Sequence, residues 1–186
     1  GYKDQLVKEF SLNSKKKFQK LSRGNQTIVG LIVGLASRAR FTIFDEPSLG
    51  LDAAHRDRFY QLILEDIEKN PRTIIISTHL IDEVSNVFEE IIILKDEGVF
   101  IQEEVASLME KAYYLNGKEE KILGLIKKDR IINKENFGST SIVALFDDLD
   151  MEDKSRLEAH NIGVSQIPLQ KLFIYLTENS LRKEAL

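Results

Sequence analysis

Two short apolar segments with a helical segment between them constrain the fold of this chain most strongly. Residues Phe41–Phe44 and Thr73–Ser77 are almost wholly apolar and short, as buried strands of a parallel sheet are. Between them, Ala53–Lys69 carries apolar residues at helical spacing, and Pro71 follows its end. The order strand, helix, strand predicts a right-handed crossover connection within a parallel sheet.

The flanking segments extend this pattern in both directions. A helix is predicted to begin near Asn25, and because the apolar content is nearly continuous over Ile28–Ala36 we expect most of its surface to be buried. A further helix through Val84 and Val87 leads to a third apolar strand, Ile91–Leu94. After a turn, Val99–Gln102 is predicted to return as the second arm of a hairpin.

The composition changes after about Glu104, so we predict a domain boundary between residues 1–103 and 104–186. The later segment alternates short strands with helices, and Pro168 is suited to the first turn of a closing helix. The predicted fold class is therefore α/β. It combines a partial parallel sheet with helices and a small C-terminal α+β unit.

The bulk properties exclude several classes of protein. The net charge of −4 does not favour nucleic acid or an anionic membrane as a partner. Cysteine is absent, which excludes disulfide frameworks and thiolate metal sites and fits a cytoplasmic location. The longest uncharged apolar run, between Arg23 and Arg38, is shorter than the roughly 20 residues of a membrane-spanning helix. Because the chain begins with Gly1 rather than Met, we treat it as a fragment.

Two adjacent carboxylates follow the first strand, where ligands bind in open α/β sheets. Side chains alternate in direction along a strand, so Asp45 and Glu46 are expected to point to different partners. One can face a magnesium ion while the other faces an attacking water, a division of labour found in phosphoryl-transfer sites. The alternative is that Asp45 only turns the chain before Pro47.

Two further elements lie within reach of such a site. Residues 21–25 precede the buried helix, and a serine hydroxyl, a glycine and free amide groups at a helix start favour an anion. The alternative is that Ser22 or Asn25 is an ordinary N-cap. His79 follows the second strand, where its ring can donate a hydrogen bond to a phosphate oxygen, unless it is only a polar loop residue.

The order and spacing of these elements resemble the ATP-binding-cassette (ABC) ATPases. Leu21-Ser22-Arg23-Gly24-Asn25 resembles the family signature, Leu-Ser-Gly-Gly-Gln, and residues 41–46 resemble the Walker B strand with its catalytic glutamate. Residues 48–52 look like the D-loop, and His79 matches the switch histidine. The likeness covers roughly residues 6–102, and the tail is similar to the accessory region of some bacterial exporters.

The resemblance implies that the partial parallel sheet is P-loop NTPase-like and belongs to a truncated cassette. It also implies a dimer of cassettes that binds ATP and Mg²⁺ between its subunits. By that resemblance Asp45 helps to hold magnesium, Glu46 polarises water and His79 senses the terminal phosphate. Ser22, Gly24 and Asn25 serve the nucleotide of the partner subunit, and Asp52 communicates across the interface. A transmembrane permease is the implied second partner, which places the protein on the inner face of the cell membrane.

Two departures from the family pattern leave other functions open. Arg23 and Asn25 stand where the family has glycine and glutamine, and no Gly-x-x-x-x-Gly-Lys-Ser/Thr segment occurs in the chain. We therefore expect negligible ATPase activity from these residues alone. One alternative is a noncatalytic interaction or regulatory module derived from a cassette. The other is an ABC ATPase that acts on nucleic acid, because of the basic residues Lys15–Lys17, Lys20 and Arg23.

Overall fold

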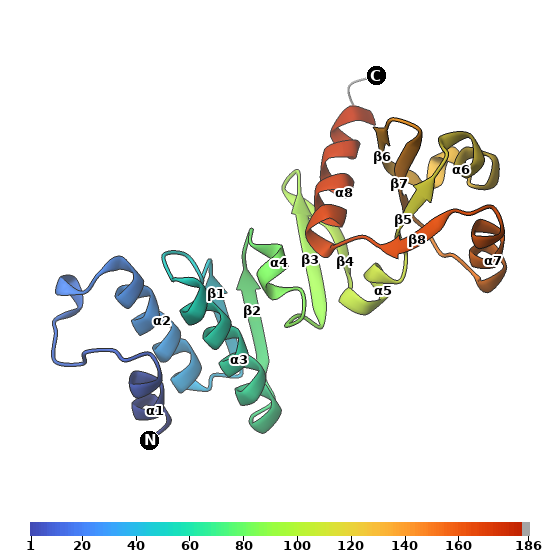
Figure 1. Cartoon of the computed structure of the whole chain (residues 1–186). Helices are drawn as coiled ribbons and strands as arrows, with labels where there is room; N and C mark the ends of the chain where they lie inside the picture. Colours follow the sequence, from blue (N-terminus) through green and yellow to red (C-terminus); the bar gives the residue numbers. More distant parts are fainter. Residues whose placement is uncertain (184–186) are drawn as a thin grey trace. The chain divides into compact units, whose positions relative to one another are not determined.

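The computed structural model describes residues 1–183, with side-chain surroundings through residue 178. It divides into two compact units, Gly1–Val87 and Phe88–Leu186 (Figure 1). The sequence boundary at residues 103 and 104 would leave Ile91–Leu94 and Val99–Gln102 with the first region. In the structure these segments belong to the second compact unit, and the domain boundary at residues 103 and 104 stays a prediction.

The first unit contains the predicted strand–helix–strand element. Its elements are α1 (Tyr2–Glu9), the 3₁₀ turn η1 (Phe18–Lys20), α2 (Arg23–Ser37), β1 (Phe41–Asp45), α3 (Ala53–Lys69), β2 (Thr73–Ser77) and α4 (Ile81–Val84). Strands β1 and β2 pair in parallel, from Phe41 opposite Thr73 to Asp45 opposite Ser77. The parallel pairing and the intervening helix are as predicted, whereas the helix expected through Val84 and Val87 ends at Val84.

One face of the β1–β2 sheet forms the core of this unit. Phe44 is buried there, and its ring meets that of Phe59 on α3 edge-on at a centroid distance of 5.3 Å. A Cβ atom added to Gly34 of α2 would lie 2.4 Å from the Phe44 ring, so only glycine lets helix and strand approach this closely. The absence of a side chain at position 34 therefore fixes how α2 packs on β1.

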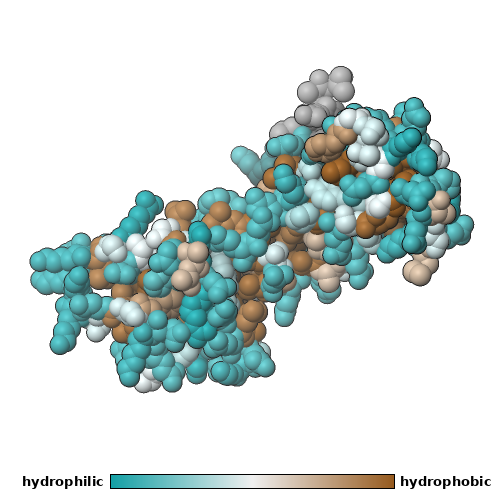
Figure 2. All heavy atoms as spheres, viewed as in Figure 1, coloured by the Kyte–Doolittle hydropathy of each residue, from teal (hydrophilic) through white to brown (hydrophobic). Residues whose placement is uncertain are grey.

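The other face of the same sheet is apolar but open. Phe41, Ile43 and Ile75 are 67%, 71% and 48% exposed, and all three lie on the face opposite Phe44. In the view of Figure 2, hydrophobic residues reach the surface of the molecule at several places between hydrophilic ones. Parallel sheets are normally covered on both faces, so this open face is unusual for the architecture.

The second unit begins with a hairpin rather than with a third parallel strand. Its elements are β3 (Glu90–Lys95), β4 (Gly98–Glu104), α5 (Val105–Met109), β5 (Ala112–Gly117), α6 (Glu119–Leu125), the 3₁₀ turn η2 (Lys128–Arg130), β6 (Ile131–Phe137), β7 (Thr140–Phe146), α7 (Met151–Ala159), β8 (Gly163–Gln166) and α8 (Leu169–Lys183). Strands β3 and β4 form the predicted antiparallel hairpin. The structure therefore corrects the expectation that Ile91–Leu94 continues the parallel sheet.

The remaining strands form one antiparallel sheet in the order β6-β7-β5-β8. With α6 and α7 between the strand pairs, this is the βαββαβ, ferredoxin-like arrangement, which gives the predicted α+β unit a definite topology. Helices α6 and α7 bury Leu115, Ile122 and Leu157 in a core on one face. Helix α8 lies against the other face, where the Tyr114 and Tyr175 hydroxyls are 3.1 Å apart.

Among the helices that the structure describes, none combines the length and the apolar content needed to cross a bilayer.

Candidate functional site

The carboxyl ends of β1 and β2 bring Asp45 and Ser77 side by side, because the parallel register pairs these two residues. The Ser77 hydroxyl donates a hydrogen bond to the Asp45 carboxylate. The same hydroxyl oxygen accepts from the Glu46 N–H at 3.2 Å, and the Ser77 carbonyl accepts from that N–H at 3.0 Å. Ser77 thus fixes the Asp45 side chain and the Glu46 backbone at once.

Glu46 has a backbone conformation that few side chains adopt. Its φ angle is +44°, in the left-handed region, which costs on the order of 1–3 kcal/mol for a residue other than glycine. Its N–H is held by Ser77, and its carbonyl accepts from the Leu49 N–H at 3.1 Å. These bonds on both sides hold the strained turn.

The turn brings Glu46 to His79. The His79 Nδ1 atom lies 2.8 Å from Glu46 Oε1, and the imidazole side chain is 63% exposed. The other carboxylate oxygen, Glu46 Oε2, is buried without a hydrogen-bond partner among the described residues. A carboxylate that a histidine holds through one oxygen keeps the second oxygen free to accept a hydrogen bond, and a water molecule would have to enter this buried position to give a proton to it.

The signature-like segment opens α2, and Ser22 is the N-cap. Its Oγ accepts from the Asn25 N–H at 3.3 Å, so the ordinary capping interaction is present. A Cβ atom on Gly24 would lie 2.8 Å from the Gly50 carbonyl oxygen. Glycine at position 24 is therefore required by close contact with the D-loop-like segment.

The D-loop-like segment also ends in a cap. Asp52 accepts from the His55 N–H at 2.9 Å at the start of α3, and the His55 ring lies 2.8 Å from the same carboxylate. The His55 backbone N–H, followed by its side chain, lowers the pKa of Asp52. Thr27 on α2 donates to the Leu49 carbonyl at 3.2 Å, which joins the two segments a second time.

The predicted site residues therefore fall into two groups. Asp45, Glu46 and His79 meet at the end of the β1–β2 sheet. Ser22, Gly24, Asn25 and Asp52 belong to two adjoining helix starts, and no hydrogen bond or ion pair with Glu46 or His79 is found for them among the described residues.

The sequence motifs alone indicate no role for Ser77 or Thr27. The signal for Ser77 was available, because a polar residue that ends the second strand must lie opposite Asp45 if the strands pair in parallel and in register. Thr27 lies in the interior of a helix, where a sequence gives no indication of its tertiary partner.

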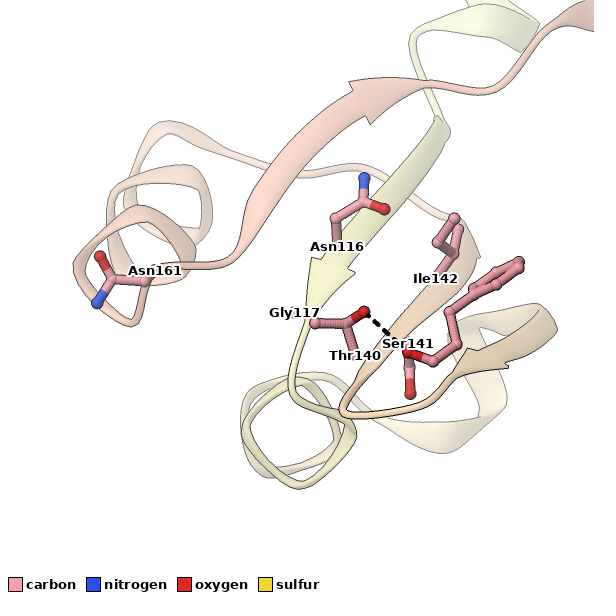
Figure 3. A pocket seen from close by; sticks show the side chains of 7 residues that line it. Asn116, Gly117, Thr140, Ser141, Ile142 and Asn161 are labelled. Atoms are coloured by element: carbon pink, nitrogen blue, oxygen red, sulfur yellow. Dashed lines mark hydrogen bonds between the residues drawn. The ribbon is translucent and has the colours of Figure 1, made fainter.

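A hollow in the second unit is separate from these residues. It has a volume of about 370 Å³ and lies where β5 ends and β7 begins (Figure 3). Its lining carries amide, hydroxyl and apolar side chains, which include Asn116, Thr140 and Ile142. Because none of its lining residues titrates near neutral pH, it is not suited to acid–base chemistry.

The oxygen ligands at Asp45 fit Mg²⁺, which needs few protein ligands, better than a metal ion that is bound by protein side chains alone. Within the described part of the chain, no group of three or more histidine, cysteine or acidic residues could hold an ion. Mg²⁺ commonly takes only one or two carboxylates and completes its shell with water and substrate phosphates. One carboxylate, oriented by a serine hydroxyl, meets that requirement.

Comparisons with known proteins find relatives for part of the chain. A family model described as "AAA domain, putative AbiEii toxin, Type IV TA system" matches residues 14–85, which include every site residue named above. Two solved ABC-type ATPase structures share the fold. One, described as a cobalt transport ATP-binding protein, has 19% identity and a TM-score of 0.51 over 83% of this chain and 55% of its own. The other, a dimeric bacterial ABC transporter cassette, has 27% identity and a TM-score of 0.50 over 56% and 46%.

Curated relatives give the same class. YtrB of Bacillus subtilis, an ABC transporter ATP-binding protein, is 26% identical over 53% of this chain and 34% of its own length. An uncharacterized ABC transporter ATP-binding protein of Methanocaldococcus jannaschii is 31% identical over 61% and 42%. The chain is thus a homologue of ABC transporter ATP-binding proteins, and it spans less than half the length of these two relatives.

Proposed function

We propose that this chain is part of the ATP-binding subunit of an ABC transporter and that the end of its β1–β2 sheet is the hydrolytic site. The contact between Glu46 and His79 is the observation that carries the proposal, since it joins an acid with an unpaired oxygen to an exposed imidazole. The similarity to ABC transporter ATP-binding proteins supports the same class.

In this proposal each residue of the first group has a separate task. Glu46 accepts a proton from the attacking water. His79, in its doubly protonated form, donates from Nδ1 to the Glu46 carboxylate and from Nε2 to the terminal phosphate. Asp45 would hold Mg²⁺, which neutralises charge on the phosphate oxygens. Ser77 keeps the Asp45 carboxylate at the strand end.

The second group serves a neighbouring subunit. Ser22, Gly24 and Asn25 open a helix whose free N–H groups and dipole favour an anion, which would be the ATP of the partner cassette. Asp52 would contact the partner across the interface. The further partner would be a transmembrane permease, which would hold the protein at the inner face of the membrane, and we infer export as the direction of transport.

Two other functions remain as competing proposals. Arg23 and Asn25, which depart from the family signature, favour a noncatalytic interaction or regulatory module. The Glu46–His79 contact disfavours the noncatalytic module, because a protein without catalytic activity does not require a glutamate in a strained backbone conformation. An ABC ATPase that acts on nucleic acid rests on the basic residues Lys15–Lys17, Lys20 and Arg23, and salt-sensitive binding of DNA or RNA would support it.

The Glu46→Gln substitution in the full-length protein tests the catalytic proposal. The amide keeps the shape of the side chain but cannot accept the proton, so we expect ATP turnover to fall by about 10²-fold or more. ATP binding should be retained, because the carboxylate acts on water. Glu68→Gln on the exposed surface of α3 is the matched control and should leave turnover unchanged. Turnover near the normal rate in Glu46→Gln would remove the role assigned to Glu46.

A further inference from the structure

The second unit has a free sheet edge at β8. This strand ends the order β6-β7-β5-β8, so it pairs with β5 on one side only. Protein sheets usually protect such edges with proline, charge or a bulge. Residues Gly163–Gln166 contain no proline and no charged side chain, and their pairing with β5 has no irregularity. Shortness is the one protective device that this strand has.

The ladder with β5 determines which backbone groups point outward. The Ile167 N–H donates to the Ala112 carbonyl at 3.1 Å, which makes these two residues a hydrogen-bonded pair. Such pairs alternate along an antiparallel ladder, so Ser165 and Gly163 also point their backbone groups toward β5. Val164 and Gln166 therefore turn their N–H and C=O groups away from the sheet, and neither has a backbone partner there among the described residues.

A groove runs beside this edge. It has a volume of about 560 Å³ and lies between β8 and α7, which are side by side in Figure 1. Val164 contributes an apolar side chain on this face, because it pairs with the core residue Leu115. Lys154 and Glu158, one helical turn apart on α7, contribute charges of opposite sign. The groove thus offers apolar surface from β8 and charges of both signs from α7.

We propose that β8 pairs with β8 of a second copy of this chain, antiparallel and about a two-fold axis through Ser165. The outward groups of Val164 and Gln166 flank Ser165 symmetrically, so Val164 of one copy exchanges two hydrogen bonds with Gln166 of the other. The symmetric partners do the same, which gives four backbone hydrogen bonds. The sheets of the two copies become continuous.

The charges on α7 select a second copy over an unrelated peptide. A two-fold axis sets the two α7 helices antiparallel over the junction, so Lys154 of one copy approaches Glu158 of the other. Within one copy the Lys154 ammonium lies over the Tyr113 ring, 5.0 Å from its centroid, and Glu158 has no ion pair among the described residues. This surface is therefore complementary to itself. The proposal is independent of the nucleotide site.

A single cysteine tests the pairing, since the chain has no cysteine of its own. In the proposed pair the two Ser165 residues face each other without hydrogen bonds, at a Cα separation of about 4.5 Å that a disulfide can span. Ser165→Cys should form a disulfide-linked dimer under mild oxidation, at least about tenfold faster than Ser155→Cys, an exposed serine on α7. Equal rates for the two variants would overturn the proposal.

Three edge variants complete the test. Val164→Pro removes an outward N–H and leaves the inward ladder with β5 intact, so combined with Ser165→Cys it should return crosslinking to the rate of the Ser155→Cys control. The double variant Val164→Lys with Gln166→Lys keeps the outward backbone N–H and C=O groups but places like charges opposite each other across the junction. Combined with Ser165→Cys, it should lose crosslinking as Val164→Pro does. Val164→Thr keeps both the N–H and the shape and should retain crosslinking. A wild-type chain that stays monomeric in sedimentation at millimolar concentration would also refute the pairing, even if another peptide binds the edge.

Discussion

Single residues determine how the two helix starts of the first unit meet. Gly24 and Gly50 lie in backbone contact, and Gly50 has a φ angle of +83°, which a residue with a side chain adopts only under strain. Thr27 donates to the Leu49 carbonyl at 3.2 Å, and the Leu49 N–H donates to the Glu46 carbonyl. A chain of contacts therefore joins the signature-like segment to the proposed catalytic acid.

Gly24→Ala tests this contact. The added Cβ would lie 2.8 Å from a backbone oxygen that cannot move without shifting the loop, so we expect the free energy of unfolding to fall by about 1–3 kcal/mol. Gly30→Ala in the same helix is the matched control. No atom lies within 4 Å of its added Cβ, so the unfolding free energy should rise by up to about 1 kcal/mol.

Urea unfolding of both variants measures the difference. Equal unfolding free energies for the two alanine variants would contradict the close contact between Gly24 and Gly50.

At the scale of elements, a buried ion pair joins α3 to the start of β2. Asp66 on α3 is 3% exposed, and its Oδ2 atom lies 2.5 Å from the Arg72 guanidinium. Asn70 at the end of α3 donates to Asp66 Oδ1 at 3.1 Å, and Arg38 after α2 lies 3.7 Å from the same oxygen. The end of one crossover helix is thereby tied to the strand that follows it.

Asp66→Asn should destabilise this unit strongly. The substitution leaves the Arg72 charge buried without a counter-charge, which costs about 3–5 kcal/mol. Glu65→Gln, next to it on α3, breaks a half-exposed pair with Arg58 that solvent screens, so it should cost much less than Asp66→Asn. Thermal and urea unfolding measure both losses, and a loss for Asp66→Asn no larger than for Glu65→Gln would show that the burial of this pair has no energetic consequence.

At the scale of the molecule, the chain holds only some of the groups that phosphoryl transfer requires. Asp45, Glu46 and His79 are assembled, but the sequence has no phosphate-binding loop. Positioning and charge stabilisation supply most of the catalysis in such sites, and the loop with its lysine provides much of both.

We therefore predict that this chain by itself binds Mg²⁺–ATP weakly and hydrolyses it negligibly. Isothermal titration and a phosphate-release assay on the 186-residue chain check this, with the Glu46→Gln variant as the background control. Micromolar affinity, or turnover above that background, would show that the phosphate-binding loop is dispensable.

The sequence by itself determined most of the elements and indicated a class of chemistry. Hydrophobic periodicity and apolar content located the parallel strands, the helix between them and the hairpin, because these signals are local in the sequence. The residues at the strand ends were named correctly as neighbours, since parallel strands place their carboxyl ends at one edge.

Only the tertiary structure decided which atoms meet. The Ser77 hydroxyl between Asp45 and the Glu46 N–H, the contact of Gly24 with Gly50, and the partners of Asp66 all join residues distant in sequence. The same holds for the free edge of β8, which depends on the order of strands in the sheet. Local periodicity predicts a strand, but strand order is set by the packing of the whole unit, which no short segment encodes.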